Sequence, residues 1–263
     1  MPAVYAHQIF GFEILKNLPT ELAELITEHK TQFQIGLQGP DYLFFYKPFT
    51  KNTINQTGYD LHYRPAAEFL EKVIPVIKTK GIRSPEYAYL LGFICHFMLD
   101  STCHPYVEEQ VKTLSFDHIE MESEFERLLL TKAGHEPLSY PVHKLIPTDN
   151  VTAECIASLY EGVSVEDVTY ALKSMYFYKK ILTAPGTVKR NLLLGLLHVA
   201  GKYESMQGQV LKPVMNPKAE ITNPHLWQLF HQAVKDTVPI LADFHVRVTE
   251  GKELNERFNR NFD

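Results

Sequence analysis

The chain has 263 residues, 45% of them hydrophobic, and a formal net charge of −5 at pH 7. This length allows a sizeable core in one large domain or two small ones, and the negative charge argues against a stable complex with nucleic acid. No stretch approaches the roughly 18 apolar residues of a transmembrane helix, and we find no secretion signal at the N-terminus.

Helical periodicity dominates the sequence, and no segment alternates as a strand does. Ser84-Pro85-Glu86 is a typical helix start, and Ser164 with Asp167 resembles a capping box. Asn223-Pro224 is expected to open the last long helix. The predicted helices cover residues 20–30, 65–80, 85–103, 116–132, 150–161, 164–182, 187–202 and 224–249, with loops at 51–60 and 135–148. The sequence therefore predicts an all-α fold.

The predicted helix 85–103 and the residues just after it carry an unusual pattern of polar groups. His96, Asp100 and His104 follow one another at intervals of four, so they share one side of a helix that is otherwise apolar. Burying a carboxylate and two imidazoles costs several kcal/mol unless something pairs with them. A metal ion is one candidate partner.

The next predicted helix repeats the pattern, because His118 and Glu122 are again four residues apart. Imidazole and carboxylate groups are ligands for zinc, and also for iron or manganese. Two such sets on successive helices favour a metal site. The alternative is a set of core histidines held by hydrogen bonds, together with surface salt bridges. The acidic run 120–126 is expected to be mostly a solvated helix face.

The segments HFMLDSTCHP and DHIEMESEFE together resemble the zinc-dependent phospholipase C and P1-type nuclease superfamily. Three further segments extend the resemblance over roughly residues 1–130. Asp41 lies in GLQGPDYLFF, His62 in YDLHYRP and His7 in AHQIFG. The resemblance implies a multi-helix bundle that holds two or three zinc ions. The implied ligands are His7, Asp41, His62, His96, Asp100, His104, His118 and Glu122.

In the pattern that the resemblance implies, Asp41, His62, His96 and Asp100 hold one ion, and Asp100 bridges to a second. His104, His118 and Glu122 hold another ion, and His7 contributes to a third. The secreted enzymes also use the amino group of an N-terminal tryptophan, which this chain lacks. Removal of Met1 would give the Pro2 amine that place, five residues before His7; the alternative is a frayed terminus and only two ions.

The domain organisation follows from the position of these residues. We expect residues 1–149 to form the metal-binding helical region and residues 150–263 to add helices that pack on the same domain. Periodicity alone leaves a small second domain open. Cys95, Cys103 and Cys155 cannot all pair within the chain, which favours a reduced, cytoplasmic protein.

The implied function is hydrolysis of a phosphodiester, either a phospholipid head group or a small molecule, with Asp41 orienting the attacking water. Two alternatives were weighed. One is a metal-stabilised binding or regulatory helical protein without catalysis. The other, an HD-type phosphohydrolase, needs a His-Asp dipeptide that this sequence lacks. The sequence indicates neither the choice between lipid and nucleotide nor the oligomeric state.

Overall fold

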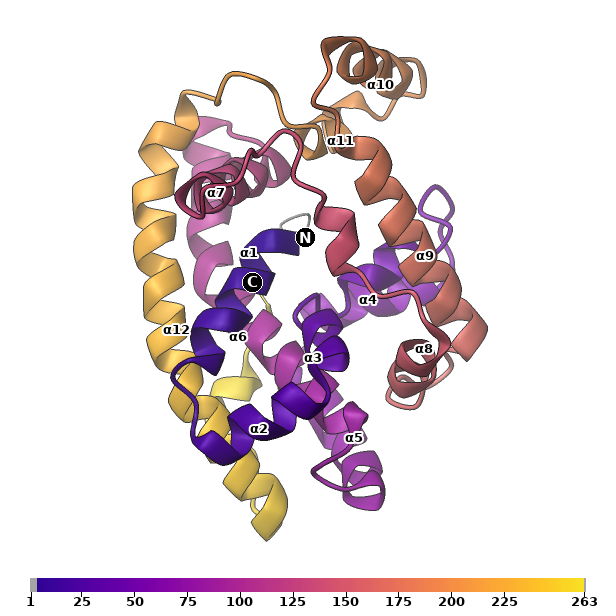
Figure 1. Ribbon diagram of the computed structural model, residues 1–263, viewed down its shortest axis with the longest axis vertical. Coiled ribbons are helices and arrows are strands. Elements are labelled where there is room, and N and C mark those ends of the chain that lie inside the picture. The colour runs from indigo at the N-terminus through magenta and orange to yellow at the C-terminus, as the bar shows by residue number, and fades with distance from the viewer. Residues whose placement is uncertain (1–3, 263) are drawn as a thin grey trace.

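The computed structural model describes residues 4–262, and over this range the chain consists of helices and turns without any strand (Figure 1). This confirms the all-α prediction. The α-helices are α1 (Val4–Leu15), α2 (Thr20–Glu28), α3 (Lys30–Gly36), α4 (Thr53–Tyr63), α5 (Ala66–Lys80), α6 (Pro85–Leu114), α7 (His118–Lys132), α8 (Asn150–Ala157), α9 (Val165–Leu182), α10 (Thr187–Val199), α11 (Tyr203–Met206) and α12 (Lys218–Glu250). Short 3-10 turns are η1 (Asp41–Phe45), η2 (Val142–Leu145), η3 (Gln207–Gln209) and η4 (Glu256–Asn259).

Helix α6 runs through the middle of the molecule, with the other helices placed around it (Figure 1). Its start is the predicted one: the Ser84 hydroxyl accepts a hydrogen bond from the Tyr87 amide, and Pro85 occupies the first turn. The helix continues past Pro105 to Leu114, about three turns beyond the predicted end. Its first half is buried on all sides, which explains why its sequence is apolar all round.

Two glycines allow α3 to cross α6 at very short range. A Cβ atom on Gly36 would overlap the carbonyl oxygen of Tyr89, and one on Gly92 would overlap that of Phe33. Because both obstacles are backbone atoms, neither could move aside. The crossing holds the chain that follows α3, including η1, against the side of α6.

Several helices depart from the sequence prediction. Residues 51–60 were expected to be a loop, but most of them belong to α4, which starts with a capping box between Asn52 and Asn55. Helix α12 begins at Lys218 rather than at Asn223-Pro224, and Pro224 lies within its second turn. Helices α1 and α3 were not predicted at all. The capping box of Ser164 and Asp167 at the start of α9 is confirmed.

The C-terminal helices pack onto the elements that precede them. Helix α12 lies along α6, and α9 lies against η1. Helix α10 stands at the edge of the molecule beside α11 (Figure 1). Between residues 4 and 262, no helix combines the length and apolar character that crossing a membrane would need. The boundary predicted at residue 149 stays a prediction.

Candidate metal centre

The eight residues predicted as ligands lie together in three neighbouring groups. Within each group, one candidate ligand atom per residue lies within 4.8 Å of the others. The first group is His7, His96 and Asp100; the second is Asp41, His62 and His96; the third is His104, His118 and Glu122. His96 belongs to two groups, and Asp100 Oδ2 lies 3.9 Å from Nε2 of His104 in the third, so the three groups form one continuous cluster.

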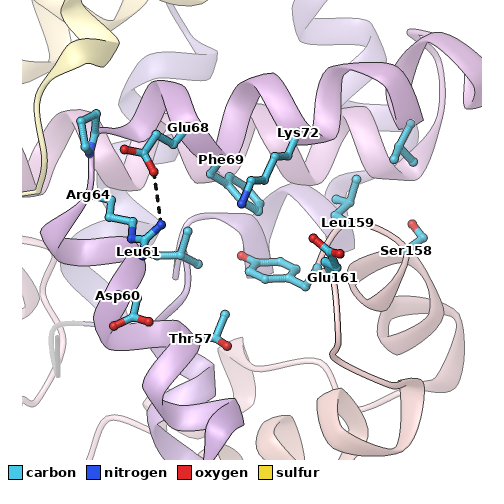
Figure 2. Close-up of a pocket in the computed structure, with 13 residues that line it drawn as sticks. Thr57, Asp60, Leu61, Arg64, Glu68, Phe69, Lys72, Ser158, Leu159 and Glu161 are labelled. Carbon is cyan, nitrogen blue, oxygen red and sulfur yellow. Dashed lines mark hydrogen bonds and ion pairs between the residues drawn. The ribbon is translucent and has the colours of Figure 1, made fainter.

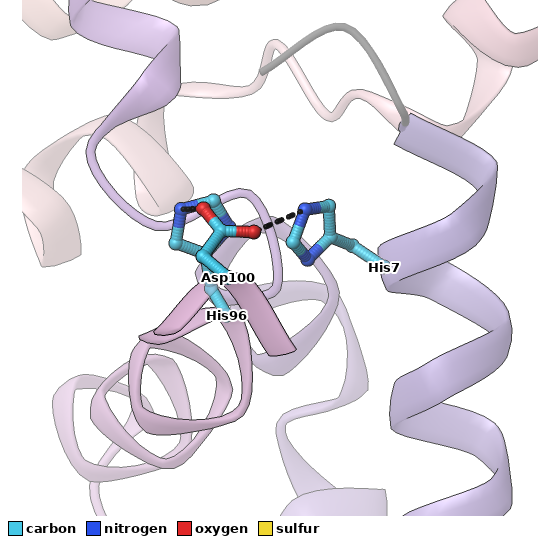
Figure 3. A group of neighbouring side chains, drawn as sticks. All are labelled: His7, His96 and Asp100. Carbon is cyan, nitrogen blue, oxygen red and sulfur yellow. Dashed lines mark ion pairs between the residues drawn. The ribbon is translucent and has the colours of Figure 1, made fainter. Parts of the chain in front are cut away.

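The first group joins the start of the chain to α6. His7 projects from α1 toward Asp100 and His96, which lie one turn apart on α6 (Figure 3). Nε2 of His7 is 3.3 Å from Oδ1 of Asp100, and Nε2 of His96 is 3.1 Å from Oδ2 of the same carboxylate. The two imidazole rings stack with their centroids 4.4 Å apart.

The second group brings η1 and α4 to the same histidine of α6. Oδ1 of Asp41 lies 3.1 Å from Nε2 of His62 and 3.7 Å from Nε2 of His96. Nδ1 of His62 lies 2.8 Å from the Gly58 carbonyl oxygen, and Nδ1 of His96 lies 3.3 Å from that of Leu37. Because a carbonyl oxygen only accepts, each Nδ1 carries the proton, and each Nε2 presents its lone pair, as a metal-binding histidine requires.

The third group is built by α7 and the second half of α6. On α7, the expected spacing of four brings Nε2 of His118 within 2.9 Å of Oε1 of Glu122. Nε2 of His104 lies 3.6 Å from the same oxygen. On its other side, Nδ1 of His118 is 2.8 Å from Oε1 of Glu108, an acceptor that orients the ring.

The charges of the cluster favour ionised carboxylates. Burial alone raises the pKa of the Asp100 carboxyl, but the surrounding imidazoles of His96, His104 and His7 outweigh it and hold that pKa well below its usual range. Burial likewise opposes ionisation of Glu122, yet His118 and His104 lower its pKa to about 2. Burial and the neighbouring His96 lower the pKa of His7, whereas the pKa of His118 is raised, because Glu122 outweighs the opposing effect of burial. Ionised carboxylates and neutral imidazoles are the forms that bind metals.

The residues fit a set of metal ions. Among the described residues, several buried ligand atoms face one another without a hydrogen bond of good geometry, and these include Nε2 of His96, Oδ2 of Asp100 and Oε2 of Glu122. Buried polar atoms are normally satisfied, and so many in one place call for a missing partner. Cations in the middle of each group would satisfy them, and nitrogen with carboxylate oxygen is a donor set that zinc accepts.

Gly39 and Phe262 carry no ligand atom but lie against histidines of the cluster. Gly39 has a left-handed backbone, with φ of 51°, and a Cβ atom there would lie 2.7 Å from Nε2 of His96. Phe262 is fully buried, and its ring centroid lies 4.8 Å from that of His62 and 5.7 Å from that of His96. The Phe262 amide also donates to the His62 carbonyl oxygen, so the chain around residue 262 covers one side of the cluster.

The acidic run of α7 is not the solvated face that the sequence suggested. Its four glutamates are all buried, and the three that are not candidate ligands pair with cations or amides. Lys212 binds Glu120 at 2.9 Å, and Arg127 binds Glu124 at 2.7 Å. No sequence pattern indicates the pairing of Glu120 with Lys212, since Lys212 lies far along the chain.

Glu126 and Lys179 are functional candidates that sequence reasoning missed. Glu126 lies one turn beyond Glu122, and its Oε1 accepts a hydrogen bond from the Tyr5 amide at 2.5 Å, which ties α7 to the start of the helix that carries His7. Lys179 of α9 is also buried. Burial lowers the pKa of Lys179, while the charges of Glu126, Asp41 and Glu122 oppose that shift. The one sequence feature that points to Glu126 is its spacing, four residues after Glu122, which is itself four residues after His118.

A cavity of about 380 Å³ opens onto the third group, because His118 and Glu122 are part of its lining. Its other walls are largely aromatic and include Phe44, Phe49 and Tyr178. A separate cavity of about 510 Å³ lies between α4, α5 and residues 158–161, and the eight candidate ligands take no part in its lining (Figure 2). Its wall contains the exposed ion pair of Arg64 and Glu68. Of these two cavities, the first therefore reaches the cluster, at its third group.

The fold and the cluster define an all-α protein with buried imidazole and carboxylate groups able to hold several metal ions. A model of the family described as zinc dependent phospholipase C matches residues 6–172, which is more than half of the chain, and the chain belongs to this family. No curated protein and no solved structure matches it. Family and donor groups together support a metal-dependent hydrolase. Pro2, whose amine is one of the two alternatives for the third ion, lies outside the described residues.

Proposed function

We infer that the protein is a zinc-dependent phosphodiester hydrolase of the phospholipase C type, acting on a phospholipid head group or a small phosphodiester. The observation that carries this inference is the continuous cluster of three donor groups at the end of an accessible cavity. A wholly structural site would be closed, with four protein ligands on each ion. Three ions with four protein ligands each would need more ligands than these eight residues provide, so a set of three ions leaves positions for water and substrate.

The candidate ligands have two roles in this proposal. The eight ligand residues hold the ions, and Asp41 in addition orients the water that attacks phosphorus. When bound, zinc would supply Lewis-acid chemistry, lowering the pKa of water toward 7 and neutralising charge on the phosphoryl oxygens. The P–O bond to the leaving alcohol breaks as the water oxygen bonds to phosphorus, so the products are an alcohol and a phosphomonoester. Iron or manganese in place of zinc is an outcome that elemental analysis would reveal.

Metal content and hydrolysis test the proposal together. We expect two or three zinc ions per chain by elemental analysis, and hydrolysis of at least one diester in a panel of a short-chain phosphatidylcholine, a dinucleotide and bis(p-nitrophenyl) phosphate. His96→Ala should lose metal and activity, because His96 serves two donor groups. His231→Ala, which changes an exposed histidine of α12, is the matched control.

The alternative, a metal-stabilised binding or regulatory protein, makes a different prediction. It would bind the metal fully and unfold more readily without it, yet hydrolyse none of these diesters. A metal-loaded protein with that behaviour would refute the hydrolase proposal. A folded protein that takes up no metal would refute both.

A further inference from the structure

Helix α10 presents an apolar stripe to solvent. Val188, Leu192, Leu196 and Val199 follow one another at intervals of three or four, so they lie along one side of the helix. Their exposed fractions are 84%, 61%, 57% and 87%. The opposite side of the helix, with Leu193, Leu194 and Leu197, packs on Leu182, Ala184 and Val210. The helix is thus anchored by one apolar side and exposes another.

The outward stripe has the composition of a helix that lies in a membrane surface. A polar border flanks it, with Lys189 on one side and Asn191 and His198 on the other. Helices of this kind bury their apolar side at the boundary between lipid head groups and acyl chains. At 13 residues, α10 is too short to span the hydrocarbon core, which takes about 20 residues, so it would lie along the surface.

The charges around the stripe complement a lipid surface. Between residues 180 and 205 the chain carries Lys180, Lys189, Arg190 and Lys202 against a single acidic residue, Glu204, although the whole chain has a net charge of −5. Lys180, Lys189 and Lys202 are exposed. Lipid phosphates would attract this region. A second copy of the chain would instead bring two basic regions together, and like charges disfavour that contact.

Helix α10 also lies next to the cavity that reaches the metal centre, with its inner side toward it. Leu182, in the cluster on which the inner side of α10 packs, also lines that cavity, and so do Tyr178, which packs on the same cluster, and Lys202 just after the helix. Phe49, another lining residue, is 58% exposed. A bilayer against the stripe would lie about one helix diameter, about 10 Å, from this wall of the cavity that contains His118 and Glu122. Helix α10 lies outside the part of the chain that the family model matches.

We propose that α10 docks the protein onto a phospholipid bilayer through Val188, Leu192, Leu196 and Val199, with the surrounding lysines attracting anionic lipids. This proposal rests on the proposed function, because the role of docking would be to deliver lipid head groups to the metal centre. The docking itself requires no catalysis. It can therefore be measured separately.

Vesicle flotation tests the docking directly. Zinc-loaded protein should float with vesicles of phosphatidylcholine and phosphatidylglycerol, and less with phosphatidylcholine alone. The double variant Leu192→Glu/Leu196→Glu should partition at least about tenfold more weakly, because two apolar anchors are replaced by charges that anionic lipids repel. Ile221→Glu is the matched control, since Ile221 is an exposed residue of α12 with a 61% exposed fraction. It should float as the unaltered protein does.

A labelled cysteine gives a second measurement that leaves the stripe apolar. Cys95, Cys103 and Cys155 are buried, so an environment-sensitive fluorophore should react with a cysteine introduced at Val199. Emission from Val199→Cys should shift to the blue on addition of vesicles, and emission from Ile221→Cys should not. Unchanged flotation of the double variant, or no flotation of the unaltered protein, would overturn the proposal.

Two further results separate this proposal from the proposed function and from self-association. Hydrolysis of a soluble diester should be equal in the unaltered protein and the double variant, whereas hydrolysis of vesicle lipid should fall in the variant. Flotation without hydrolysis of any substrate would support docking and refute the hydrolase. A dimer that the double variant dissociates, with no vesicle binding, would show that a second copy covers α10 and would overturn the lipid proposal.

Discussion

Replacing Gly39 with alanine is expected to displace a side chain of the metal centre without removing any ligand. Gly39 precedes Pro40 and Asp41 on the turn that enters η1, and its φ of 51° lies in the left-handed region. An added Cβ atom would overlap the ring of His96. That ring cannot move freely, since its Nδ1 is held by the Leu37 carbonyl oxygen. The substitution should therefore displace a ligand shared by two donor groups.

The size of the effect follows from two separate costs. An alanine in the left-handed region costs about 1–2 kcal/mol, and overpacking against the imidazole adds about 1–3 kcal/mol. We expect Gly39→Ala to lower the free energy of unfolding by about 2–5 kcal/mol. Gly134 offers a matched control, because its φ is 76° and a Cβ atom there would meet nothing within 4 Å. Gly134→Ala should cost only the first term, about 1–2 kcal/mol.

Urea unfolding in the presence of a chelator would measure both costs without bound metal, and elemental analysis would give zinc per chain. Gly39→Ala should lose zinc as well as stability, whereas Gly134→Ala should keep its zinc. Equal destabilisation of the two variants, together with equal zinc content, would show that the contact between Gly39 and His96 does not matter.

Three other perturbations have defined outcomes. Phe262→Ala should lower the free energy of unfolding by about 3–5 kcal/mol and speed the transfer of zinc to a chelator, because Phe262 is buried against His62. Phe177→Ala, at an exposed residue, is the control, and an unchanged rate of zinc transfer in Phe262→Ala would show that Phe262 does not cover the site. Glu126→Gln should lower the free energy of unfolding by about 1–2 kcal/mol and reduce zinc per chain, since it weakens the hydrogen bond from the Tyr5 amide that positions the helix carrying His7. Full zinc content would argue against that link. In the metal-free chain, burial opposes ionisation of Glu122, but His118 and His104 lower its folded-state pKa from 4.5 to about 2. The stability this contributes is present above pH 4.5 and lost as the pH falls toward 2, so urea unfolding of Glu122→Gln should depend less steeply on pH in that range.

The helices that sequence predicted well are those with local signals. Ser84-Pro85 starts α6 and the Ser164 capping box starts α9, so periodicity and caps agree there. Helix α1 has no such start signal among its described residues and is apolar on most sides, which hides its period. Helix α4 is polar, so its composition resembles that of a loop despite the local cap at Asn52. Tertiary packing, and not local preference, sustains α1.

The candidate site was predicted unevenly for a similar reason. The pairs on α6 and α7 follow from spacing within one helix, whereas His7, Asp41 and His62 came from a family resemblance and gain their neighbours only when distant segments pack. Their convergence in the fold is consistent with the predicted ligand set, which stays a prediction until metal is measured. Lys179 carried no local signal, because its burial beside the cluster depends on how α9 lies against η1. The cytoplasmic location also stays a prediction.

The placement of the donor groups on five different elements means that bound metal would cross-link distant segments of the chain. All three cysteines are free, so no covalent tie joins distant segments of the described chain. Ions held by the three groups would instead fasten α1, η1, α4 and α7 to α6, and those of the first two groups would close long loops, as a disulfide does. Stripped of metal, the protein loses these cross-links all at once. Metal supply should therefore decide how long the chain survives a protease.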